Sequence, residues 1–319
     1  MRNIHKSFPG VRALQAVDFT LREGEIHALM GENGAGKSTL IKVLTGVYEK
    51  DEGEIYLKGF DKAVTIKSPQ DAQNVGISTV YQEITLCPNL SVAENMYIGR
   101  TKGAGLNWSK MNKDADAILQ SLDIPAKATQ QLSTCSIAIQ QMVAIARAVD
   151  MDCKVLILDE PTSSLDDNEV KKLFKLMLNL KAKGVGIIFV THFLEQVYEV
   201  CDRITVLRDG KLVGEYEIAN LPRVQLVAKM LGKEYDDMSE IKSKNKKYES
   251  NDEKPLFEAE DLQSNAGIHP FDFNIKKGEV NGFVGLLGSG RSECVRAIYG
   301  ADPVIGGKVK KNGEVIKIS

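Results

Sequence analysis

The sequence predicts an α/β fold in which helices cover a mainly parallel β-sheet. Three short apolar runs, at residues 26–30, 155–158 and 187–190, are suited to buried strands, and helix-compatible stretches separate them. This alternation is typical of parallel sheets that are covered on both faces. Over residues 91–149 the strand signals fade and helix-compatible segments dominate, so we expect a helical subdomain there.

One segment of the sequence occurs twice. GEIHALMGENGAGKSTLIKVLTG starts at Gly24 and is matched by GEVNGFVGLLGSGRSECVRAIYG from Gly278, so the second copy is offset by 254 residues (278 minus 24). Several glycines keep this offset, at positions 31, 36, 46, 53 and 59 of the first copy. Repetition at this scale indicates a duplicated domain.

A charged segment separates the two copies. Residues 234–254 are mostly charged and polar and contain little that could anchor in a core, which predicts a linker. We therefore expect a first domain over residues 1–233 and a second over residues 255–319. The second copy stops soon after its glycine-rich loop, so we expect it to be incomplete.

Composition argues against several classes of protein. The chain of 319 residues has 41 Lys and Arg against 43 Asp and Glu, a net charge of −2, so nothing overall favours a nucleic-acid partner. Its five cysteines are scattered without a CxxC pair, which is typical of reduced thiols. No apolar stretch approaches the ~20 residues that span a bilayer, and the first residues lack a signal-peptide pattern. We expect a soluble or peripheral protein that binds no nucleic acid.

A glycine-rich motif carries the first chemical signal. GENGAGKST, residues 31–39, fits the pattern G-x-x-x-x-G-K-[ST] and lies between an apolar run and a helix-compatible segment, as a phosphate-binding loop requires. Its glycines let backbone N–H groups turn toward phosphate oxygens, Lys37 reaches the terminal phosphates, and the Ser38 hydroxyl is placed for Mg²⁺. The loop is therefore predicted to bind ATP with Mg²⁺. The residues expected to contact the nucleotide are Glu32, Asn33, Gly34, Ala35, Gly36, Lys37, Ser38 and Thr39.

Two carboxylates follow the apolar run of VLILDE. Asp159 and Glu160 emerge at the carboxyl end of the predicted strand, where ligands bind in open α/β sheets. Asp159 is suited to hold Mg²⁺, directly or through water, and Glu160 is suited to orient or deprotonate the attacking water. Alone, the pair could simply begin a turn before Pro161. Its combination with the phosphate loop favours the catalytic interpretation.

With these motifs the chain resembles the ATP-binding cassette (ABC) proteins, because further elements follow in that family's order and spacing. Gln82 in VYQE resembles the Q-loop glutamine, which contacts magnesium and the attacking water. SSLD, which ends at Asp166, resembles the D-loop, and His192 in FVTHF resembles the switch histidine near the terminal phosphate. Phe8 in KSFPG resembles the aromatic residue that stacks on adenine.

The resemblance implies a P-loop NTPase fold with ATP and Mg²⁺ as cofactors. It assigns the metal to Ser38, Gln82 and Asp159. The residues to which it assigns catalysis are Lys37, Gln82, Glu160 and His192. Each single motif has an ordinary alternative, because a loop glutamine is usually solvated, a histidine after a strand is usually structural, and a phenylalanine near a terminus is usually core. Their occurrence together in register favours the functional interpretation.

One motif departs from the family. Its signature, LSGGQ, precedes a helix similar to QQMVAIARAV, residues 140–149, and counting backward places residues 135–139 in the signature slot. Ser136 matches the family, but Ile137 and Ala138 stand where it has glycines. Those glycines let a helix N-terminus approach ATP held by an opposing cassette. We therefore expect the side chains of Ile137 and Ala138 to crowd that approach.

The second copy departs as well. Arg291 stands in place of the phosphate-loop lysine, so the positive charge is kept while its length and planarity change. One composite site is therefore expected to be degenerate on both faces. In the family the competent site pairs the first phosphate loop with a signature in the second cassette. The resemblance thus implies that this chain alone binds ATP but hydrolyses it poorly.

The asymmetry, together with GVYEKDEGEI, TVYQE and VAENMYIGR, resembles the fused two-cassette ATPases of monosaccharide importers. THFLEQVYEVCDRITVLRDG looks closest to their galactofuranose branch. The resemblance implies ATP-driven sugar uptake at the cytoplasmic face of the cell membrane. The implied partners are a membrane permease that docks near residues 82–100, indirectly a sugar-binding protein, and a second cassette or homodimer partner.

Two alternatives stay open at the level of sequence. A soluble ABC ATPase that acts on ribosomes or DNA would typically keep an intact signature, unlike residues 135–139. A truncated remnant that binds nucleotide without turnover is motivated by the incomplete second copy. The chain also begins close to where the resemblance implies that the first strand is already running.

Overall fold

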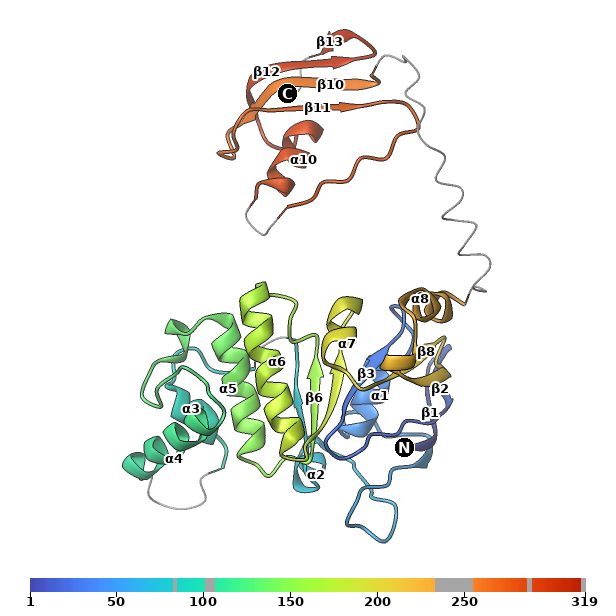
Figure 1. Ribbon diagram of the computed structural model, residues 1–319, viewed down its shortest axis with the longest axis vertical. Coiled ribbons are helices and arrows are strands. Elements are labelled where there is room, and N and C mark those ends of the chain that lie inside the picture. The colour runs from blue at the N-terminus through green and yellow to red at the C-terminus, as the bar shows by residue number, and fades with distance from the viewer. Residues whose placement is uncertain (83–84, 101–106, 233–254, 286–288, 317–319) are drawn as a thin grey trace. The chain divides into compact units, whose positions relative to one another are not determined.

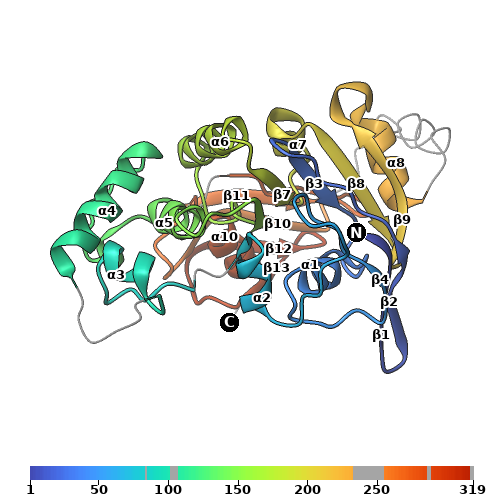
Figure 2. The same ribbon diagram turned by 90° about the horizontal axis from the view of Figure 1, so that it is seen from below.

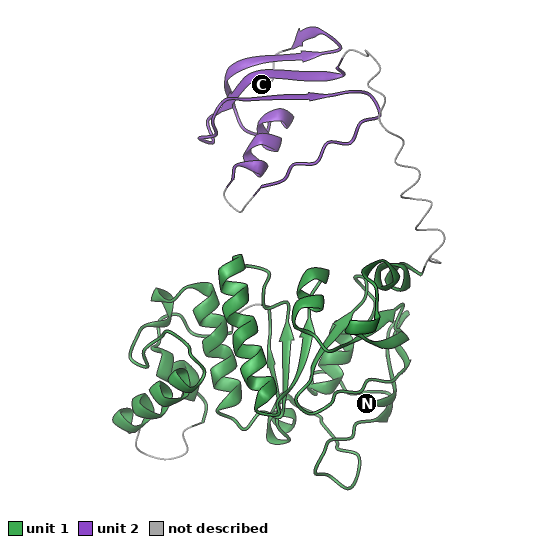
Figure 3. Ribbon diagram, viewed as in Figure 1, with its two compact units in different colours: residues 1–242 green, residues 243–319 purple. Residues whose placement is uncertain are grey.

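The computed structural model describes residues 1–82, 85–100, 107–232, 255–285 and 289–316 (Figure 1). The chain divides into two compact units, residues 1–242 and 243–319 (Figure 3). Each unit has hydrophobic core residues of its own. The predicted linker, residues 234–254, lies outside the described residues.

A six-stranded sheet forms the centre of the first unit. Its strands lie in the order β5-β6-β7-β3-β8-β9. All neighbouring pairs are parallel except β8 and β9, which are antiparallel. The strands are β3 (Ile26–Met30), β5 (Ile77–Val80), β6 (Val155–Asp159), β7 (Gly186–Val190), β8 (Arg203–Arg208) and β9 (Lys211–Glu217). The predicted α/β class with a parallel-rich sheet is confirmed.

Helices cover both faces of this sheet, as Figure 2 shows. One face carries α1 (Lys37–Leu44) and α2 (Pro69–Asn74). The other carries α5 (Ile137–Val149), α6 (Asp167–Ala182) and α7 (Leu194–Val200). In β6, Leu156 and Leu158 belong to the core of the second face, whereas Ile157 belongs to the core of the first, because successive side chains of a strand alternate. Burial on both faces explains why β6 and β7 are almost continuously apolar.

Residues 91–149 are helical where the structure describes them. They contain α3 (Val92–Tyr97), α4 (Trp108–Ser121), the 3₁₀ helix η1 (Leu132–Thr134) and α5. A capping box between Ser91 and Glu94 starts α3, since each side chain accepts a hydrogen bond from the other residue's backbone N–H. The last described elements of the first unit are η2 (Ile218–Asn220) and α8 (Arg223–Leu231). No helix of the described residues is long and apolar enough to cross a membrane.

A smaller antiparallel sheet flanks the central one. It has the order β2-β1-β4, with β1 (Arg2–Phe8), β2 (Val11–Val17) and β4 (Glu52–Glu54). Strand β2 lies against the glycine-rich loop, because a Cβ atom on Gly36 would come within 2.8 Å of the Ala13 carbonyl oxygen. This sheet therefore forms one wall beside the loop.

The second unit repeats the beginning of the first. Its four-stranded antiparallel sheet has the order β11-β10-β12-β13. Its elements are β10 (Phe257–Ser264), β11 (Phe271–Ile275), α10 (Arg291–Tyr299), β12 (Val304–Lys311) and β13 (Glu314–Ile316). Helix α10 follows Gly290 with φ +85°, just as α1 follows Gly36 with φ +102°. The sequence repeat is thus also a structural repeat.

One part of the repeat folds differently in the two units. Residues 280–284 correspond to β3 but form no strand, and Val280 and Val284 are 95% and 93% exposed. Strand β3 itself is buried along its whole length between β7 and β8. The described part of the second unit has no strands in those two places, so the equivalent segment lacks the partners that would pair with it.

A buried polar cluster joins β3 to β8. His27 lies with Nδ1 3.3 Å from a Glu25 carboxylate oxygen and Nε2 2.7 Å from the Thr205 hydroxyl, and Arg203 donates to Glu25 at 2.9 Å. Burial lowers the pKa of His27, although Glu25 acts to raise it. Burial acts to raise the pKa of Glu25, but hydrogen bonds from His27 and the Arg22 backbone, with the charge of Arg203, lower it to about 2. A neutral His27 that donates from Nδ1 to an ionised Glu25 satisfies every contact.

This cluster predicts acid sensitivity. A histidine whose pKa is lowered on folding takes up more protons in the unfolded state, so the stability present above its ordinary value of 6.5 is lost as pH falls. Glu25 adds a loss of the same sign between its ordinary value of 4.5 and about 2. The wild type should therefore lose roughly 1 kcal/mol of unfolding free energy per pH unit below pH 6.5. His27→Gln should lack this loss when both proteins are unfolded with urea. The control is His269→Gln, at an exposed position; an unchanged slope in His27→Gln would contradict the assignment.

Candidate functional site

The predicted site residues follow four adjacent parallel strands. The loop at 31–39 leaves the carboxyl end of β3, Gln82 follows β5, Glu160 follows β6 and His192 follows β7. These strands lie side by side in the order β5-β6-β7-β3. Parallel strands present their carboxyl ends at one edge of the sheet. The structure therefore gathers these four segments along one edge.

The glycine-rich loop has the backbone of an anion cradle. Gly31, Gly34 and Gly36 all have positive φ, at 155°, 86° and 102°. A Cβ atom on Gly31 would lie 2.3 Å from the Leu207 carbonyl oxygen, so the loop passes closely over β8. No side chain caps the start of α1 and no acidic residue lies in its first turn, which leaves the helix N–H groups and the positive end of its dipole available to an anion.

The loop residues differ in exposure. Glu32, Asn33, Gly34 and Ser38 are exposed and Thr39 is half-buried, whereas Ala35 and Gly36 are buried beneath them. The exposed groups face solvent, where a ligand can reach them. The buried pair anchors the loop on the core, since Ala35 packs with the α1 side of the sheet.

Lys37 lies at the centre of its own loop. Its ammonium donates hydrogen bonds to the carbonyl oxygens of Gly31, at 2.8 Å, and of Glu32, at 3.0 Å. Burial lowers the pKa of Lys37, while the nearby carboxylates of Glu160 and Asp159 act to raise it. The side chain is thus a half-buried cation next to two acids, in the position from which it can contact a bound phosphate.

The acidic pair occupies the end of β6. Burial raises the pKa of Asp159 and the charge of Glu160 adds to the effect, whereas Lys37 and Lys42 act to lower it. Glu160 has φ +48° and its N–H donates to the Val190 carbonyl at 2.9 Å. A left-handed backbone is costly for a residue with a Cβ and often occurs where a side chain must be aimed precisely by the fold. Here it directs Glu160 toward the next loop.

His192 is the partner of Glu160 across that gap. Its Nδ1 lies 3.5 Å from the Glu160 Oε1 atom. The two loops are also joined beneath this pair, because the hydroxyls of Thr162 and Thr191 donate to the same Gln196 amide oxygen, at 2.7 and 3.3 Å. Sequence reasoning missed these three residues. The sequence carried no local signal for them, because Gln196 lies on α7 while Thr162 and Thr191 follow the separate strands β6 and β7.

Two further predicted residues follow other strands than the loop, Glu160 and His192 do. Gln82 is exposed at the end of β5, and the next two residues lie outside the described part of the chain. Phe8 ends β1 in the three-stranded sheet, where its ring meets Tyr48 edge-on at 5.1 Å and Lys6 lies 5.6 Å from its centre. The role of Phe8 as an adenine contact and the role of Gln82 as a metal ligand stay predictions.

The oxygen ligands predicted at this edge fit a magnesium ion that protein coordinates only in part. The predicted ligands are a carboxylate, a hydroxyl and an amide, from Asp159, Ser38 and Gln82. The described residues contain no cluster of three or more His, Cys, Asp or Glu able to hold a metal. Mg²⁺ usually takes one or two protein ligands, with water and phosphate completing its shell. The residues present therefore fit a magnesium ion that arrives with a nucleotide.

Comparison with known proteins agrees with this geometry. Residues 14–163 match the family model described as ABC transporter. A fructose import ATP-binding protein of Bifidobacterium longum is 48% identical over 323 residues, which is 100% of this chain and 63% of that protein. A galactofuranose transporter ATP-binding protein of Escherichia coli K12 is 49% identical over 313 residues, 98% and 62%. This chain belongs to the ABC transporter ATP-binding cassettes.

Solved structures support the same assignment. The ADP conformation of the ATP-binding cassette MJ1267 covers 72% of this chain with a TM-score of 0.64 and 28% identity, over 95% of its own length. The dimeric structure of the cassette MJ0796 bound to ADP and Pi covers 69% with a TM-score of 0.59 and 26% identity, over 98% of its length. The cassette is a nucleotide-binding fold. This chain spans just over three fifths of the length of the curated relatives that it matches.

The signature segment of the cassette differs in one respect from expectation. Ser136 caps α5, since its hydroxyl accepts from the Ile139 N–H at 3.4 Å, so the helix begins at Ile137 rather than at residue 140. Ile137 is 51% exposed, but Ala138 is 2% exposed. Of the two side chains expected to crowd an opposing nucleotide, Ala138 therefore points into the cassette's own core, and Ile137 is the one at the surface.

Asp166 has a local structural role in the cassette. Its carboxylate accepts hydrogen bonds from the Asn168 and Glu169 N–H groups at the start of α6, and Glu169 accepts from the Asp166 N–H. This capping box fixes where the helix begins. Asp166 is exposed, so its side chain is also accessible at the surface.

The loop glycines predict a difference between two alanine variants. Gly31→Ala should destabilise the protein by about 3 kcal/mol or more, because its Cβ would clash with the Leu207 carbonyl and lie 2.8 Å from Ala35. Gly34→Ala is the matched control, since its φ is also positive but no atom lies within 4 Å. It should cost only about 1–2 kcal/mol. Urea unfolding of both variants measures the difference, and equal losses would contradict the close approach to β8.

Proposed function

We propose that this chain is the ATP-binding subunit of a monosaccharide importer, which couples ATP binding and hydrolysis to sugar uptake through a membrane permease. The observation that carries the proposal is 48–49% identity, along essentially the whole chain, to a fructose import and a galactofuranose transporter ATP-binding protein. Further relatives named for ribose and galactose import are 40–42% identical. These relatives are named for different sugars, but each matches essentially the whole of this chain. This supports monosaccharide import as their shared role.

In this proposal the loop at 31–39 binds the nucleotide phosphates. The N–H groups of the loop and of α1 face the phosphate oxygens, and Lys37 exchanges its bonds to the Gly31 and Glu32 carbonyls for bonds to phosphate. Ser38, Asp159 and Gln82 hold the magnesium ion, which neutralises phosphate charge when bound. Phe8 contacts the adenine from the neighbouring sheet. The lowered pKa of Lys37 comes from burial, and an anionic ligand would favour its charged form.

Glu160 and His192 act on the attacking water. Glu160 is aimed by its left-handed backbone and lies 3.5 Å from His192, so one water can lie within reach of both and of a bound terminal phosphate. Glu160 orients this water or accepts its proton, and His192 senses the terminal phosphate. Asp166 and the segment around Ser136 face a second cassette or a homodimer partner. The permease docks near residues 82–100, at the cytoplasmic face of the membrane, and a sugar-binding protein delivers the sugar.

Two substitutions separate nucleotide binding from turnover. Lys37→Ala should weaken magnesium-dependent ATP binding at least 10-fold, because a charge-assisted contact is worth about 1.5–3 kcal/mol. Glu160→Gln should bind ATP as tightly as the wild type but lower any turnover by about 100-fold or more, because the amide cannot accept the proton. Titration with a fluorescent ATP analogue and a phosphate-release assay measure the two effects.

The matched control is Lys154→Ala, which removes an exposed lysine just before β6, at the opposite end of that strand. Both the affinity and the turnover of this variant should equal those of the wild type. The absence of any magnesium-dependent affinity in the wild-type chain would overturn the proposal.

Coupling to transport is tested with a permease of a monosaccharide importer reconstituted in liposomes. ATP turnover should rise when the chain is added to proteoliposomes that contain this permease, and Glu160→Gln should show no such rise. Equal rates for the wild type and Glu160→Gln in this assay would instead favour a nucleotide-binding protein without turnover. Copurification with ribosomes in place of the permease would favour a role outside transport.

A further inference from the structure

A hydrogen-bonded bridge lies beneath the pair formed by Glu160 and His192. Gln196 on α7 places its amide oxygen between two threonine hydroxyls, 2.7 Å from that of Thr162 and 3.3 Å from that of Thr191. Both hydroxyls donate, so together they occupy the two lone pairs of this oxygen. One side chain thus ties the loop after β6 to the loop after β7.

Both threonines of the bridge are buried. Thr162 is 4% exposed and Thr191 is 3% exposed, so water cannot easily replace Gln196 as the acceptor, and a buried hydroxyl without an acceptor is unfavourable. Gln196 is the third residue of α7, which begins at Leu194. Helical side chains lean toward the amino end of their helix, which explains how Gln196 reaches back to the loop before α7.

Thr162 connects the bridge to Glu160. The Ser163 N–H donates to the Glu160 carbonyl at 3.3 Å, and the Glu160 N–H donates to the Val190 carbonyl at 2.9 Å. Thr162 therefore lies inside a turn that begins at Glu160 and is fastened to β7 at its first residue. The left-handed backbone of Glu160 is unfavourable by itself and needs support from its surroundings. The bond from Thr162 to Gln196 gives the turn a second anchor.

Thr191 connects the bridge to His192. Its hydroxyl donates to Gln196 and accepts from the Phe193 N–H at 3.1 Å, and a hydroxyl has one proton to give and lone pairs that accept. His192 lies between the two residues of this short turn. Its ring packs against that of Phe193, with the ring centroids 4.0 Å apart. The backbone that carries His192 is thus held on both sides.

We propose that Gln196 is a positioning residue for ATP hydrolysis, which holds Glu160 and His192 at the separation from which both reach one attacking water. The two side chains lie with His192 Nδ1 3.5 Å from Glu160 Oε1. Gln196 acts through the two threonines, one in each loop. This role rests on the proposed ATPase function, because it concerns the orientation of the water in that reaction.

Gln196→Met tests this role, because methionine has a similar length and volume but offers no oxygen acceptor. With the importer permease in liposomes, Gln196→Met should lower kcat by about 10- to 100-fold, the effect of moving a catalytic group by about 1 Å. Its ATP affinity should stay unchanged, because the loop at 31–39 is not part of the bridge. Gln196→Glu should recover most of the lost kcat, since a carboxylate accepts both hydrogen bonds. A glutamine that only stabilised the fold would lower affinity and kcat together.

A double variant tests whether the effect passes through Glu160. In a Glu160→Gln background, Gln196→Met should lower the residual turnover by less than about 2-fold, because the side chain that it positions can no longer accept the proton. Full additivity of the two losses would overturn the positioning role.

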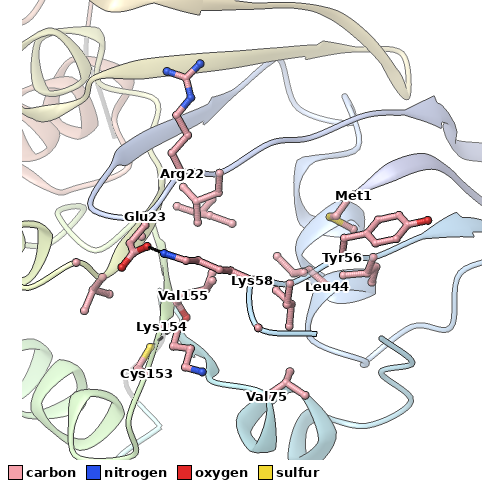
Figure 4. A pocket seen from close by; sticks show the side chains of 18 of the residues that line it. Met1, Arg22, Glu23, Leu44, Tyr56, Lys58, Val75, Cys153, Lys154 and Val155 are labelled. Carbon is pink, nitrogen blue, oxygen red and sulfur yellow. Dashed lines mark hydrogen bonds and ion pairs between the residues drawn. The ribbon is translucent and has the colours of Figure 1, made fainter. Parts of the chain in front are cut away.

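Two control variants remove polar contacts elsewhere in the first unit. Glu195→Met changes the neighbouring residue of α7, whose side chain is 80% exposed and lies 4.0 Å from Arg223. Lys58→Met removes the ion pair with Glu23, which Figure 4 shows beside a cavity of about 630 Å³ where β6 and β7 begin, at the other end of these strands. Exposed ion pairs contribute little, so both variants should keep the wild-type kcat and ATP affinity.

Hydrogen exchange tests the bridge without turnover. Release of Thr191 from Gln196 should speed exchange of the Phe193 N–H by about 10-fold or more in Gln196→Met, and Gln196→Glu should keep the wild-type rate. Unchanged exchange in Gln196→Met would overturn the bridge. Unchanged kcat in this variant, with a wild type that turns over, would overturn the positioning role alone. No turnover in the wild type would overturn the proposed function instead.

Discussion

The parallel pairing of β5, β6, β7 and β3 is the constraint on which the rest of the cassette depends. Residue pairs such as Leu158 with Phe189 and Asp159 with Val190 set the strands in register, so the segments that leave them emerge at one edge. The glycine-rich loop, the acidic pair and His192 are far apart in sequence. They become neighbours because parallel strands all end on the same side. The apolar faces of these strands, buried under helices on both sides, hold that register.

At this edge the fold maintains arrangements that are costly by themselves. Glu160 keeps a left-handed backbone, and Asp159 is an acid whose pKa is raised by burial and by its neighbour's charge. Lys37 is a half-buried cation that bonds to carbonyls of its own loop. Local strain and partly satisfied charge persist only where the surrounding core over-determines them. An anionic ligand with its cation would supply the charge partners that this edge lacks, which is a physical reason for binding to be favourable here.

The two copies show how far a strand depends on its neighbours. The β3 segment and residues 280–284 occupy corresponding places in the repeat, yet one is a buried strand and the other forms no strand. β-structure depends on cross-strand pairs, so an apolar run without partners stays unpaired whatever its propensity.

The sequence by itself determined the fold class and the repeat, and it located the glycine-rich loop and the acidic pair. These follow from local rules, because glycine spacing, strand periodicity and an acid after an apolar run carry their chemistry within a few residues. Tertiary structure decided the rest. Ala138 is buried because α5 begins one residue after Ser136 and turns that side chain inward. Gln196 joins Thr162 to Thr191 because β6 and β7 are neighbours. Contacts between residues distant in the chain are set by strand order and helix phase, which no single stretch of sequence contains.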